Sequence, residues 1–219
     1  MISAERENLK YYPVFLDIAG KKCVVVGGGD VAARKIARLM DCGARVCVVS
    51  PGLVPQLEEL KKDRLIEHIH DGYQAKYLDG AALVIGATDD EKINASISLD
   101  ARARRVPVNI VDDPQKCDFI LPSLIERGDL MIACSTGGQS PALARHLREE
   151  LESVYGEEYA VLVSILGQLR TKMEKNAGVG KTWFDQLMSA GLLDAIRNRD
   201  ATAVKTIVRD ITGEEVILG

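Results

Sequence analysis

Residues 22–32 read Lys-Cys-Val-Val-Val-Gly-Gly-Gly-Asp-Val-Ala: an apolar run, three glycines and the start of a helical pattern. The run Lys22–Val26 has no alternating polar residues, which is typical of a parallel strand buried on both faces. After the glycines, apolar residues recur at helical spacing up to Met40, and Gly43 follows where a helix is expected to end. This stretch predicts a strand, a tight turn and a helix, the repeating unit of an α/β protein.

Short apolar runs and helical patterns alternate along the chain to about residue 113. Four further runs have strand character: Arg45–Val49, Leu65–His70, Leu83–Ile85 and Val106–Val111. Helical patterns lie around Val54–Lys61 and over Glu91–Arg104. Strands that alternate with helices at this spacing form a parallel sheet with right-handed crossovers. We therefore predict a Rossmann-like, doubly wound α/β domain over residues 1–113.

The pattern changes after residue 113. Two apolar runs, Cys117–Glu126 and Leu130–Ser135, flank Arg127-Gly128-Asp129, which predicts a hairpin with a glycine turn. The hairpin lies outside the parallel sheet, and it is interpreted either as a subunit interface or as an extension of the core. Helices are predicted over Pro141–Val154, Glu158–Lys175, Trp183–Met188 and two shorter segments, with Ser140 as an N-cap. The chain is thus divided into regions 1–113, 114–148 and 149–219.

Composition excludes several classes of protein. With 47% apolar and 27% charged residues, the chain is typical of a globular protein. Its net charge of −4 argues against a general nucleic-acid-binding protein, which needs a basic surface. No stretch approaches the ~20 apolar residues that span a bilayer, and the charged N-terminal segment does not resemble a signal peptide. The five cysteines are scattered without a Cys-x-x-Cys pair, which indicates a protein of a reducing compartment. Together with the charge and the hydropathy, this predicts a cytoplasmic protein with no membrane or nucleic-acid partner.

Residues 27–32 fit the pattern Gly-x-Gly-x-x-Ala between a predicted strand and a predicted helix, the context in which this motif binds a dinucleotide. Gly27 permits the tight turn, Gly29 lets the backbone approach a pyrophosphate, and Ala32 lets the helix pack close to the strand. The N–H groups at the start of the helix then bind the anion. The predicted cofactor contacts are Gly27, Gly28, Gly29, Asp30 and Val31, with Asp30 also capping the helix. The alternative is a glycine turn that binds nothing.

The second predicted strand ends in Val49-Ser50-Pro51-Gly52. An acid at this point would bind the ribose hydroxyls of NAD, and an arginine nearby would bind the 2′-phosphate of NADP. The stretch has neither, so the residues alone leave the choice between NAD and NADP open. We predict that Ser50, Pro51 and Gly52 contact the adenosine through backbone and hydroxyl groups. Ala87 and Thr88, after the fourth strand, are expected to face the same crevice.

Several motifs between Pro13 and Arg170 occur in the order and spacing of one family. They are Val26–Ala32 with Arg34-Lys35, Ala87–Asp90 with Asn94, Asn109–Pro114, Phe119–Ser123 and Ser140–Arg145, followed more loosely by Gly167–Arg170 and Trp183-Phe184. With these motifs the chain resembles the precorrin-2 dehydrogenases, the NAD-dependent module of siroheme synthases. The resemblance implies a homodimer with a Rossmann domain, an interdigitated dimerisation region at 114–148 and a helical C-terminal region. The methyltransferase that follows this module in fused synthases is not expected in a chain that ends at Gly219.

The same resemblance implies an activity and a catalytic residue. The activity is NAD-dependent oxidation of precorrin-2 to sirohydrochlorin, with Fe²⁺ insertion to give siroheme in some members, and the family's catalytic aspartate corresponds to Asp112. This position follows the fifth predicted strand, and open α/β sheets bind ligands at the carboxyl ends of their strands. Loss of a hydride from a reduced tetrapyrrole is accompanied by loss of a proton, which a carboxylate can accept. If the side chain of Asp113 converges on that of Asp112, repulsion raises the pKa of one of them. Without the resemblance, both aspartates would be interpreted as the start of a turn before Pro114.

A polycarboxylate substrate needs cationic partners in an acidic chain. Arg145 lies near the start of a predicted helix, whose dipole favours anions, and can bind a carboxylate through two parallel hydrogen bonds. The predicted substrate contacts are Arg145 and, in the preceding glycine-rich loop, Ser135 and Thr136. A second basic cluster, Arg102, Arg104 and Arg105, is interpreted as a solvated helix face. Some members of the family carry a serine, proposed to be phosphorylated, in the loop that corresponds to residues 135–138. This chain has Thr136 in that loop, and the sequence leaves open whether Thr136 is a regulatory site.

The histidines and the metal chemistry remain open at this stage. His68 and His70 are interpreted as half-exposed residues of a strand on the far side of the sheet, and His146 either as a substrate contact or as a solvated helix residue. No metal-ligand cluster is recognisable, so the sequence decides neither whether the chain chelates Fe²⁺ nor which metal is physiological. Two alternative functions are considered beside the dehydrogenase. One is a non-catalytic NAD-sensing module that gates a partner protein, and the other is a chelatase of the same family that has lost cofactor binding. The first leaves Asp112 unexplained, and the intact glycine loop argues against the second.

Overall fold

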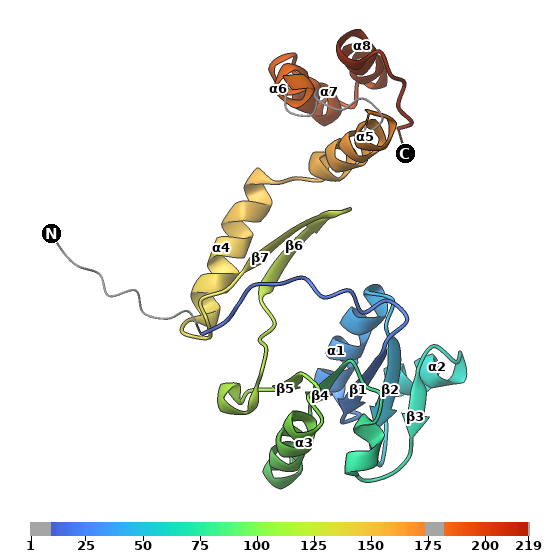
Figure 1. Ribbon diagram of the computed structural model, residues 1–219, viewed down its shortest axis with the longest axis vertical. Helices are drawn as coiled ribbons and strands as arrows, with labels where there is room; N and C mark the ends of the chain where they lie inside the picture. The colour runs from blue at the N-terminus through green and yellow to red at the C-terminus, as the bar shows by residue number, and fades with distance from the viewer. Residues whose placement is uncertain (1–9, 174–181, 219) are drawn as a thin grey trace, which may run out of the picture. The chain divides into compact units, whose positions relative to one another are not determined.

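The computed structural model describes residues 10–173 and 182–218. Within these residues the chain forms two compact units, Met1–Leu121 and Pro122–Gly219 (Figure 1). The loop after residue 113 belongs to the first unit because it is bonded to the sheet. The N–H of Asp118 donates to the carbonyl of Val108 (2.8 Å), and the side-chain amide of Asn109 donates to the carbonyl of Phe119 (2.9 Å).

The first unit contains a sheet of five parallel strands in the order β3-β2-β1-β4-β5. The strands are β1 (Lys22–Val26), β2 (Arg45–Val49), β3 (Glu67–Ile69), β4 (Leu83–Gly86) and β5 (Val108–Ile110). The helices are α1 (Asp30–Asp41), α2 (Pro55–Lys62) and α3 (Glu91–Ala103), with short 3₁₀ helices η1 (Ala75–Leu78) and η2 (Pro114–Lys116). The strand order reverses between β1 and β4, and doubly wound sheets bind their ligands beyond the carboxyl ends of the strands at this reversal. The predicted Rossmann-like fold is confirmed.

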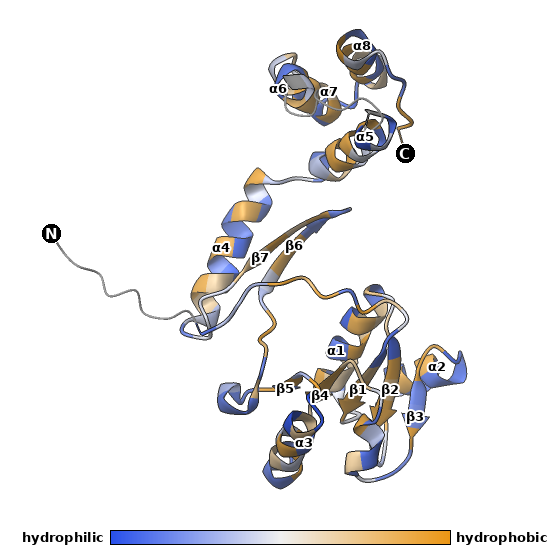
Figure 2. Cartoon of the chain, viewed as in Figure 1, coloured by the Kyte–Doolittle hydropathy of each residue, from blue (hydrophilic) through white to orange (hydrophobic). Residues whose placement is uncertain are grey.

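Both faces of this sheet are covered, which explains why the strands are apolar throughout. Successive strand residues point to opposite faces. Val25 lies in one apolar cluster with Ile36 of α1 and Leu57 of α2, whereas Val24 lies in a second cluster with Ile97 of α3. Figure 2 shows the resulting hydrophobic strands between helices with one hydrophilic side.

The cysteines of the strands are part of these apolar clusters. Cys23 and Cys47 are buried, and burial raises the pKa of each thiol to about 11. Both thiols therefore remain protonated near neutral pH and act as small apolar side chains, as predicted. All five cysteines are free thiols.

The second unit begins with the predicted hairpin, formed by β6 (Ser123–Arg127) and β7 (Leu130–Cys134). The pair Arg127 and Leu130 closes a two-residue turn in which Gly128 has φ +58°. The first apolar run contributes a strand only from Ser123 onward, so the prediction that the strand starts at Cys117 is wrong. Residues 117–119 are instead bonded back to β5 by the contacts described below.

The rest of the second unit is helical. The helices are α4 (Pro141–Val154), α5 (Glu158–Met173), α6 (Thr182–Ser189), α7 (Leu192–Arg197) and α8 (Ala201–Thr212). The Ser140 side chain accepts a hydrogen bond from the N–H of Leu143 (3.2 Å), so its prediction as the N-cap of α4 is confirmed. The helices from α5 onward share an apolar core that includes Ile165, Leu187 and Val208. The last two residues of the helix predicted to end at Lys175 lie outside the described residues. Across residues 10–173 and 182–218, no helix combines the length and the apolar character needed to cross a membrane.

Candidate active site

The three consecutive glycines at the end of β1 meet different structural requirements. Gly27 has φ +127°, and a Cβ added there would lie 2.2 Å from the carbonyl oxygen of Ala87. A Cβ added to Gly28 would lie 1.9 Å from the carbonyl oxygen of Gly52. A Cβ added to Gly29 would meet nothing within 4 Å. The first two glycines are therefore required by neighbouring backbone, whereas the space beside Gly29 is open to a ligand.

The N-terminus of α1 is not capped by a side chain. Gly29 is the N-cap residue, with φ −88° and ψ −174°, and Asp30 is the first residue inside the helix. The prediction that Asp30 caps α1 is wrong, because the chain already enters helical geometry at this residue. Its carboxylate still lies in the first turn, where the helix dipole favours negative charge. The free N–H groups of this turn, together with the open side of Gly29, form a cradle that suits the pyrophosphate of a dinucleotide.

The turn after β2 is bonded internally and rests on the glycine loop. Ser50 is 3% exposed, and its hydroxyl donates a hydrogen bond to the carbonyl of Gly52 (2.8 Å). The N–H of Val54 donates to the carbonyl of Gly28 (2.8 Å). The Ser50 hydroxyl therefore holds the turn in shape, while Pro51 and Gly52 are exposed beside the glycine loop.

His68 lies half-exposed on the outermost strand β3, as predicted, and it also supports the turn after β2. Its Nε2 atom lies 3.1 Å from the carbonyl oxygen of Ser50 and 3.2 Å from the Ser50 hydroxyl. Because a carbonyl oxygen can only accept, Nε2 carries the proton and donates to Ser50. The two residues meet because β3 pairs with β2 at the edge of the sheet. His70 is exposed, and its ring lies edge-on to that of His68, with 5.9 Å between the ring centroids.

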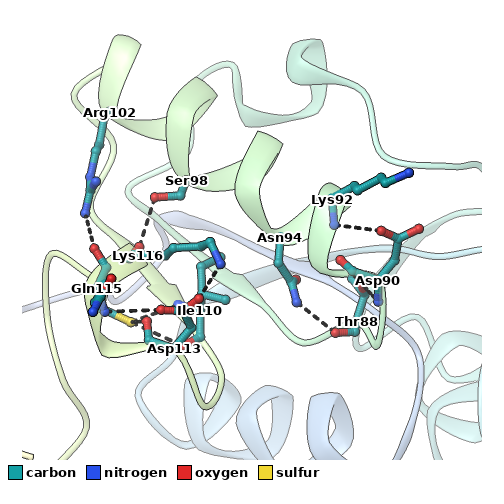
Figure 3. A network of polar contacts seen from close by, with 11 residues as sticks. Thr88, Asp90, Lys92, Asn94, Ser98, Arg102, Ile110, Asp113, Gln115 and Lys116 are labelled. Carbon is teal, nitrogen blue, oxygen red and sulfur yellow. Dashed lines mark hydrogen bonds and ion pairs between the residues drawn. The ribbon is translucent and has the colours of Figure 1, made fainter.

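The loop after β4, which contains Thr88 and Asp90 (Figure 3), lies at the carboxyl ends of the parallel strands, as does the glycine loop after β1. The N–H of Ala87 donates to the carbonyl of Val26 (2.8 Å), and the Thr88 hydroxyl accepts a hydrogen bond from the N–H of Asp90 (2.9 Å). Asn94 of α3 donates its side-chain amide to the carbonyl of Thr88 (2.9 Å). The Oδ1 atom of Asn94 is buried and has no protein partner among the described residues. The predicted contacts Ala87 and Thr88 thus share an edge with Gly27 and Gly52.

Asp112 lies beyond β5 in a left-handed backbone conformation, with φ +60°. Among non-glycine residues, aspartate and asparagine adopt this conformation most readily. The residue is exposed and is the second residue after the strand, at the ligand-binding edge of the sheet. The exposed carboxylate is therefore accessible to a ligand and can accept a proton.

Asp113 is not a free neighbour of Asp112. Its carboxylate forms an ion pair with Lys116 and accepts a hydrogen bond from the N–H of Gln115 (3.2 Å). The hydrogen bond from Lys116 is the main cause that lowers the pKa of Asp113. The expectation that repulsion raises the pKa is therefore wrong for Asp113, because Lys116 compensates its charge.

The predicted substrate contacts belong to the second unit. The Thr136 hydroxyl donates to the carbonyl of Ser140 (3.0 Å) and accepts from its N–H (2.9 Å), and the Ser135 hydroxyl accepts from the N–H of Gly137 (3.1 Å). These bonds close the loop onto the start of α4. Arg145, on the second turn of α4, is exposed and makes no ion pair within the described part of the chain. The role of these three residues toward a substrate stays a prediction.

Four other basic residues, two on α3 or directly after it and two on α4, are already paired. Arg104 lies 3.2 Å from a carboxylate oxygen of Asp79, and Arg102 lies 3.0 Å from a carboxylate oxygen of Asp118. On α4, Arg148 pairs with Glu152, and His146 lies 3.4 Å from a carboxylate oxygen of Glu150. Arg145 thus differs from them in having its guanidinium available for an anion.

Sequence reasoning assigned no role to several residues that shape this site. His68, Ser98 and Cys117 each bond to the backbone of a site loop, and Asn94 was recognised only as part of a motif. The four-residue spacing of Asn94, Ser98 and Arg102 could have indicated a polar helix face that contacts the site loops, because residues four apart lie on one face of a helix. Nothing in the sequence relates His68 to Ser50, since their contact depends on the pairing of two strands.

The chain is similar to proteins of siroheme biosynthesis. A family model described as "Putative NAD(P)-binding" matches residues 14–123, and one described as "Sirohaem biosynthesis protein central" matches residues 127–153. The siroheme synthase of Methylobacillus flagellatus is 40% identical over 169 residues, which cover 77% of this chain and 36% of that protein. The siroheme synthase of Thioalkalivibrio sulfidiphilus is 38% identical over 224 residues, which cover 96% of this chain and 46% of that protein. The chain therefore spans less than half the length of these relatives.

A solved structure has the same fold. The precorrin-2 dehydrogenase SirC superposes with a TM-score of 0.73 and 24% identity, over 93% of this chain and 100% of that chain. The similarity covers both the parallel sheet and the region that follows it.

Proposed function

Because the chain belongs to the NAD(P)-binding family found in siroheme synthases, we propose that it oxidises precorrin-2 to sirohydrochlorin with NAD⁺. The observation that carries this proposal is the joint placement of an open, uncapped cradle at Gly29 and an exposed carboxylate at Asp112 on one edge of the sheet. The relatives are named siroheme synthases and the structural neighbour is named a precorrin-2 dehydrogenase, which supports the choice of substrate. The free, scattered cysteines support a reducing compartment, the cytoplasm, as its location.

Different residues of the first unit bind the cofactor and accept the proton in this reaction. The first-turn N–H groups of α1 bind the pyrophosphate, and the turn Ser50–Gly52 lies against the adenosine. Bound NAD⁺ supplies the acceptor for the hydride that leaves the tetrapyrrole. Asp112 accepts the proton that is lost with it, which leaves one new double bond in the macrocycle.

The direct test mixes the purified protein with precorrin-2 and NAD⁺ and follows NADH absorbance. Formation of NADH and sirohydrochlorin in equal amounts supports the proposal. Binding of NAD⁺ without turnover would favour the alternative, an NAD-sensing module that gates a partner protein.

Iron insertion is proposed as a second step that needs its own test. Across the described residues, no group of three or more His, Cys, Asp or Glu side chains is arranged to hold a metal ion, so Fe²⁺ is treated as a substrate. The protein is incubated with sirohydrochlorin and Fe²⁺ or Co²⁺, with and without NAD⁺. Metal insertion faster than in the protein-free control supports this step, and equal rates exclude it.

We propose that the chain forms a homodimer and that region 114–148, with the rest of α4, forms its interface. An isolated two-stranded hairpin is at best marginally stable, and the exposed apolar residues of this unit include Met131, Leu143 and Leu147. Leu147→Lys is expected to shift the mass in sedimentation equilibrium from dimer to monomer, because it puts a charge on this surface. Leu99→Lys, at an exposed leucine of α3, is the control and is expected to remain dimeric. An unchanged dimer in Leu147→Lys would place the interface elsewhere.

Arg145 is proposed as a partner for the carboxylates of precorrin-2. Arg145→Ala is expected to raise KM for precorrin-2 about 5- to 10-fold and to leave KM for NAD⁺ nearly unchanged, because one charge-assisted contact is lost. Added salt should raise the wild-type KM for precorrin-2 as well, since exposed charges are screened within about 10 Å at 0.1 M.

Arg104→Ala is the matched control, because Arg104 is held by Asp79 and Asp100. Steady-state kinetics of both variants should show the KM effect only for Arg145→Ala. Equal, small effects of the two substitutions would mean that the substrate binds to a different surface.

A further inference from the structure

One face of α3 carries three polar residues that bond to two loops of the site. Asn94, Ser98 and Arg102 are spaced by four residues and therefore share a helix face. Each donates a hydrogen bond to a backbone carbonyl: Asn94 to Thr88 (2.9 Å), Ser98 to Lys116 (3.0 Å) and Arg102 to Gln115 (3.3 Å) (Figure 3). The first bond holds the loop after β4, and the other two hold the loop that follows Asp112.

Ser98 is the buried member of this group, with 3% exposure. Its partner Lys116 bonds to Asp113 twice: the N–H of Lys116 donates to the Asp113 carbonyl (3.1 Å), and the ammonium group pairs with the Asp113 carboxylate. A continuous path of hydrogen bonds thus runs from α3 to the residue next to Asp112.

Cys117 closes the same loop from the other side. Its sulfur accepts a hydrogen bond from the N–H of Ile110 (3.1 Å) and lies 3.1 Å from the carbonyl oxygen of Asp113 and 3.2 Å from that of Ile110. Burial raises the pKa of this thiol, so it remains a protonated donor to these carbonyls near neutral pH. Ile110 and Asp113 flank the segment that contains Asp112, and both ends of that segment are held.

We propose that Ser98 is a positioning residue for Asp112: its hydroxyl fixes Lys116 and thereby keeps the 111–117 loop closed with Asp112 in its left-handed conformation. This inference rests on the proposed function, in which Asp112 accepts the proton. Asp112 makes no side-chain hydrogen bond that would hold it among the described residues, so its position depends on the backbone on either side. Loss of the Ser98 bond lets the loop open and moves the carboxylate, and a displacement of about 1 Å can lower a rate by up to ~10².

The test compares Ser98→Ala with Ser96→Ala on the same helix. Ser96 is exposed, and its hydroxyl bonds only within α3, to the carbonyl of Lys92 (3.0 Å). Ser98→Ala is expected to lower kcat about 10-fold while KM for NAD⁺ is unchanged. Ser96→Ala is expected to keep wild-type values.

A second readout does not depend on activity. The rate at which iodoacetamide alkylates Cys117 reports opening of the loop. Peptide mass spectrometry measures this rate, with the exposed Cys42 as internal reference. Ser98→Ala should accelerate it by up to about tenfold, the factor that one lost buried hydrogen bond gives. Ser96→Ala should not change it. An unchanged rate at Cys117 in Ser98→Ala would overturn the proposal, even for a protein that does not turn over precorrin-2.

A double-substitution cycle shows whether Ser98 acts through Asp112. The rate of the Asp112→Asn protein is measured by single turnover with excess enzyme. Adding Ser98→Ala to this protein is expected to cause no further loss of rate. A full additional 10-fold loss would mean that Ser98 acts elsewhere and would overturn the inference. If Asp112→Asn alone leaves the rate unchanged, the proton-accepting role in the proposed function fails instead, and with it the role of Ser98 toward Asp112.

Discussion

The Asp112→Asn protein is expected to bind NAD⁺ like the wild type and to lose dehydrogenase turnover by about 10²–10⁴-fold. Removal of a general base commonly has an effect of this size, because the amide cannot accept the proton. Asparagine has the shape of aspartate and tolerates the left-handed backbone at φ +60°, so the loop should keep its conformation. Alanine at this position would add a backbone strain of about 1 kcal/mol, which makes asparagine the cleaner substitution.

The measurements are kcat with precorrin-2, the Kd of NAD⁺ and the thermal unfolding midpoint. Asp113→Asn is the control on the neighbouring carboxylate, which pairs with Lys116. It is expected to have the smaller effect on kcat. If Asp112→Asn retains more than half of the wild-type activity, the assignment is wrong and Asp113 becomes the candidate base.

Gly28→Ala is expected to destabilise the first unit by about 2–4 kcal/mol and to abolish NAD⁺ binding. The new Cβ would lie 1.9 Å from the Gly52 carbonyl oxygen and 2.7 Å from the Ser50 hydroxyl, so either the glycine loop or the turn after β2 has to move. Both obstacles lie in a bonded turn, and forced backbone shifts in packed regions have energies of this order. Urea unfolding monitored by circular dichroism and titration with NAD⁺ check the two effects.

Gly29→Val separates cofactor binding from folding. Its side chain would enter open space, so the loss of stability should be limited to about 1 kcal/mol from the poorer N-cap. NAD⁺ affinity should still fall, because a branched side chain stands where the pyrophosphate approaches the first-turn N–H groups. Unchanged NAD⁺ affinity in a folded Gly29→Val protein would contradict the cradle at the start of α1.

The sheet could be predicted from the sequence because its signals are local. An unbroken apolar run such as Lys22–Val26 indicates a strand covered on both faces, and Gly43 indicates where α1 ends, at φ +72°. The positions of Gly27, Gly28 and Gly29 followed from one motif. The motif explains Gly27 by the tight turn and Gly29 by the ligand, whereas the structure shows that the carbonyls of Ala87 and Gly52 also exclude a Cβ at Gly27 and Gly28.

The details of the loops could not be predicted because they depend on side-chain contacts that form only once the loops have folded. Asp113 next to Asp112 suggests repulsion, but Lys116 is brought to Asp113 by the η2 turn. Residues 117–119 have the apolar character of a strand, yet bonds from Ile110 and Asn109 hold them against β5. In both cases a hydrogen bond or ion pair made by a side chain overrides the local pattern.

The bonded state of the turns around Gly28 also bears on the kinetics of cofactor exchange. The carbonyls of Val49, Gly28 and Val26 already accept hydrogen bonds from Gly27, Val54 and Ala87 in the protein alone. A preformed receptor loses little conformational freedom when a ligand arrives, so association should proceed in a single diffusive encounter without a slow rearrangement. Differences in affinity between cofactor analogues should then appear mainly in their residence times on the protein.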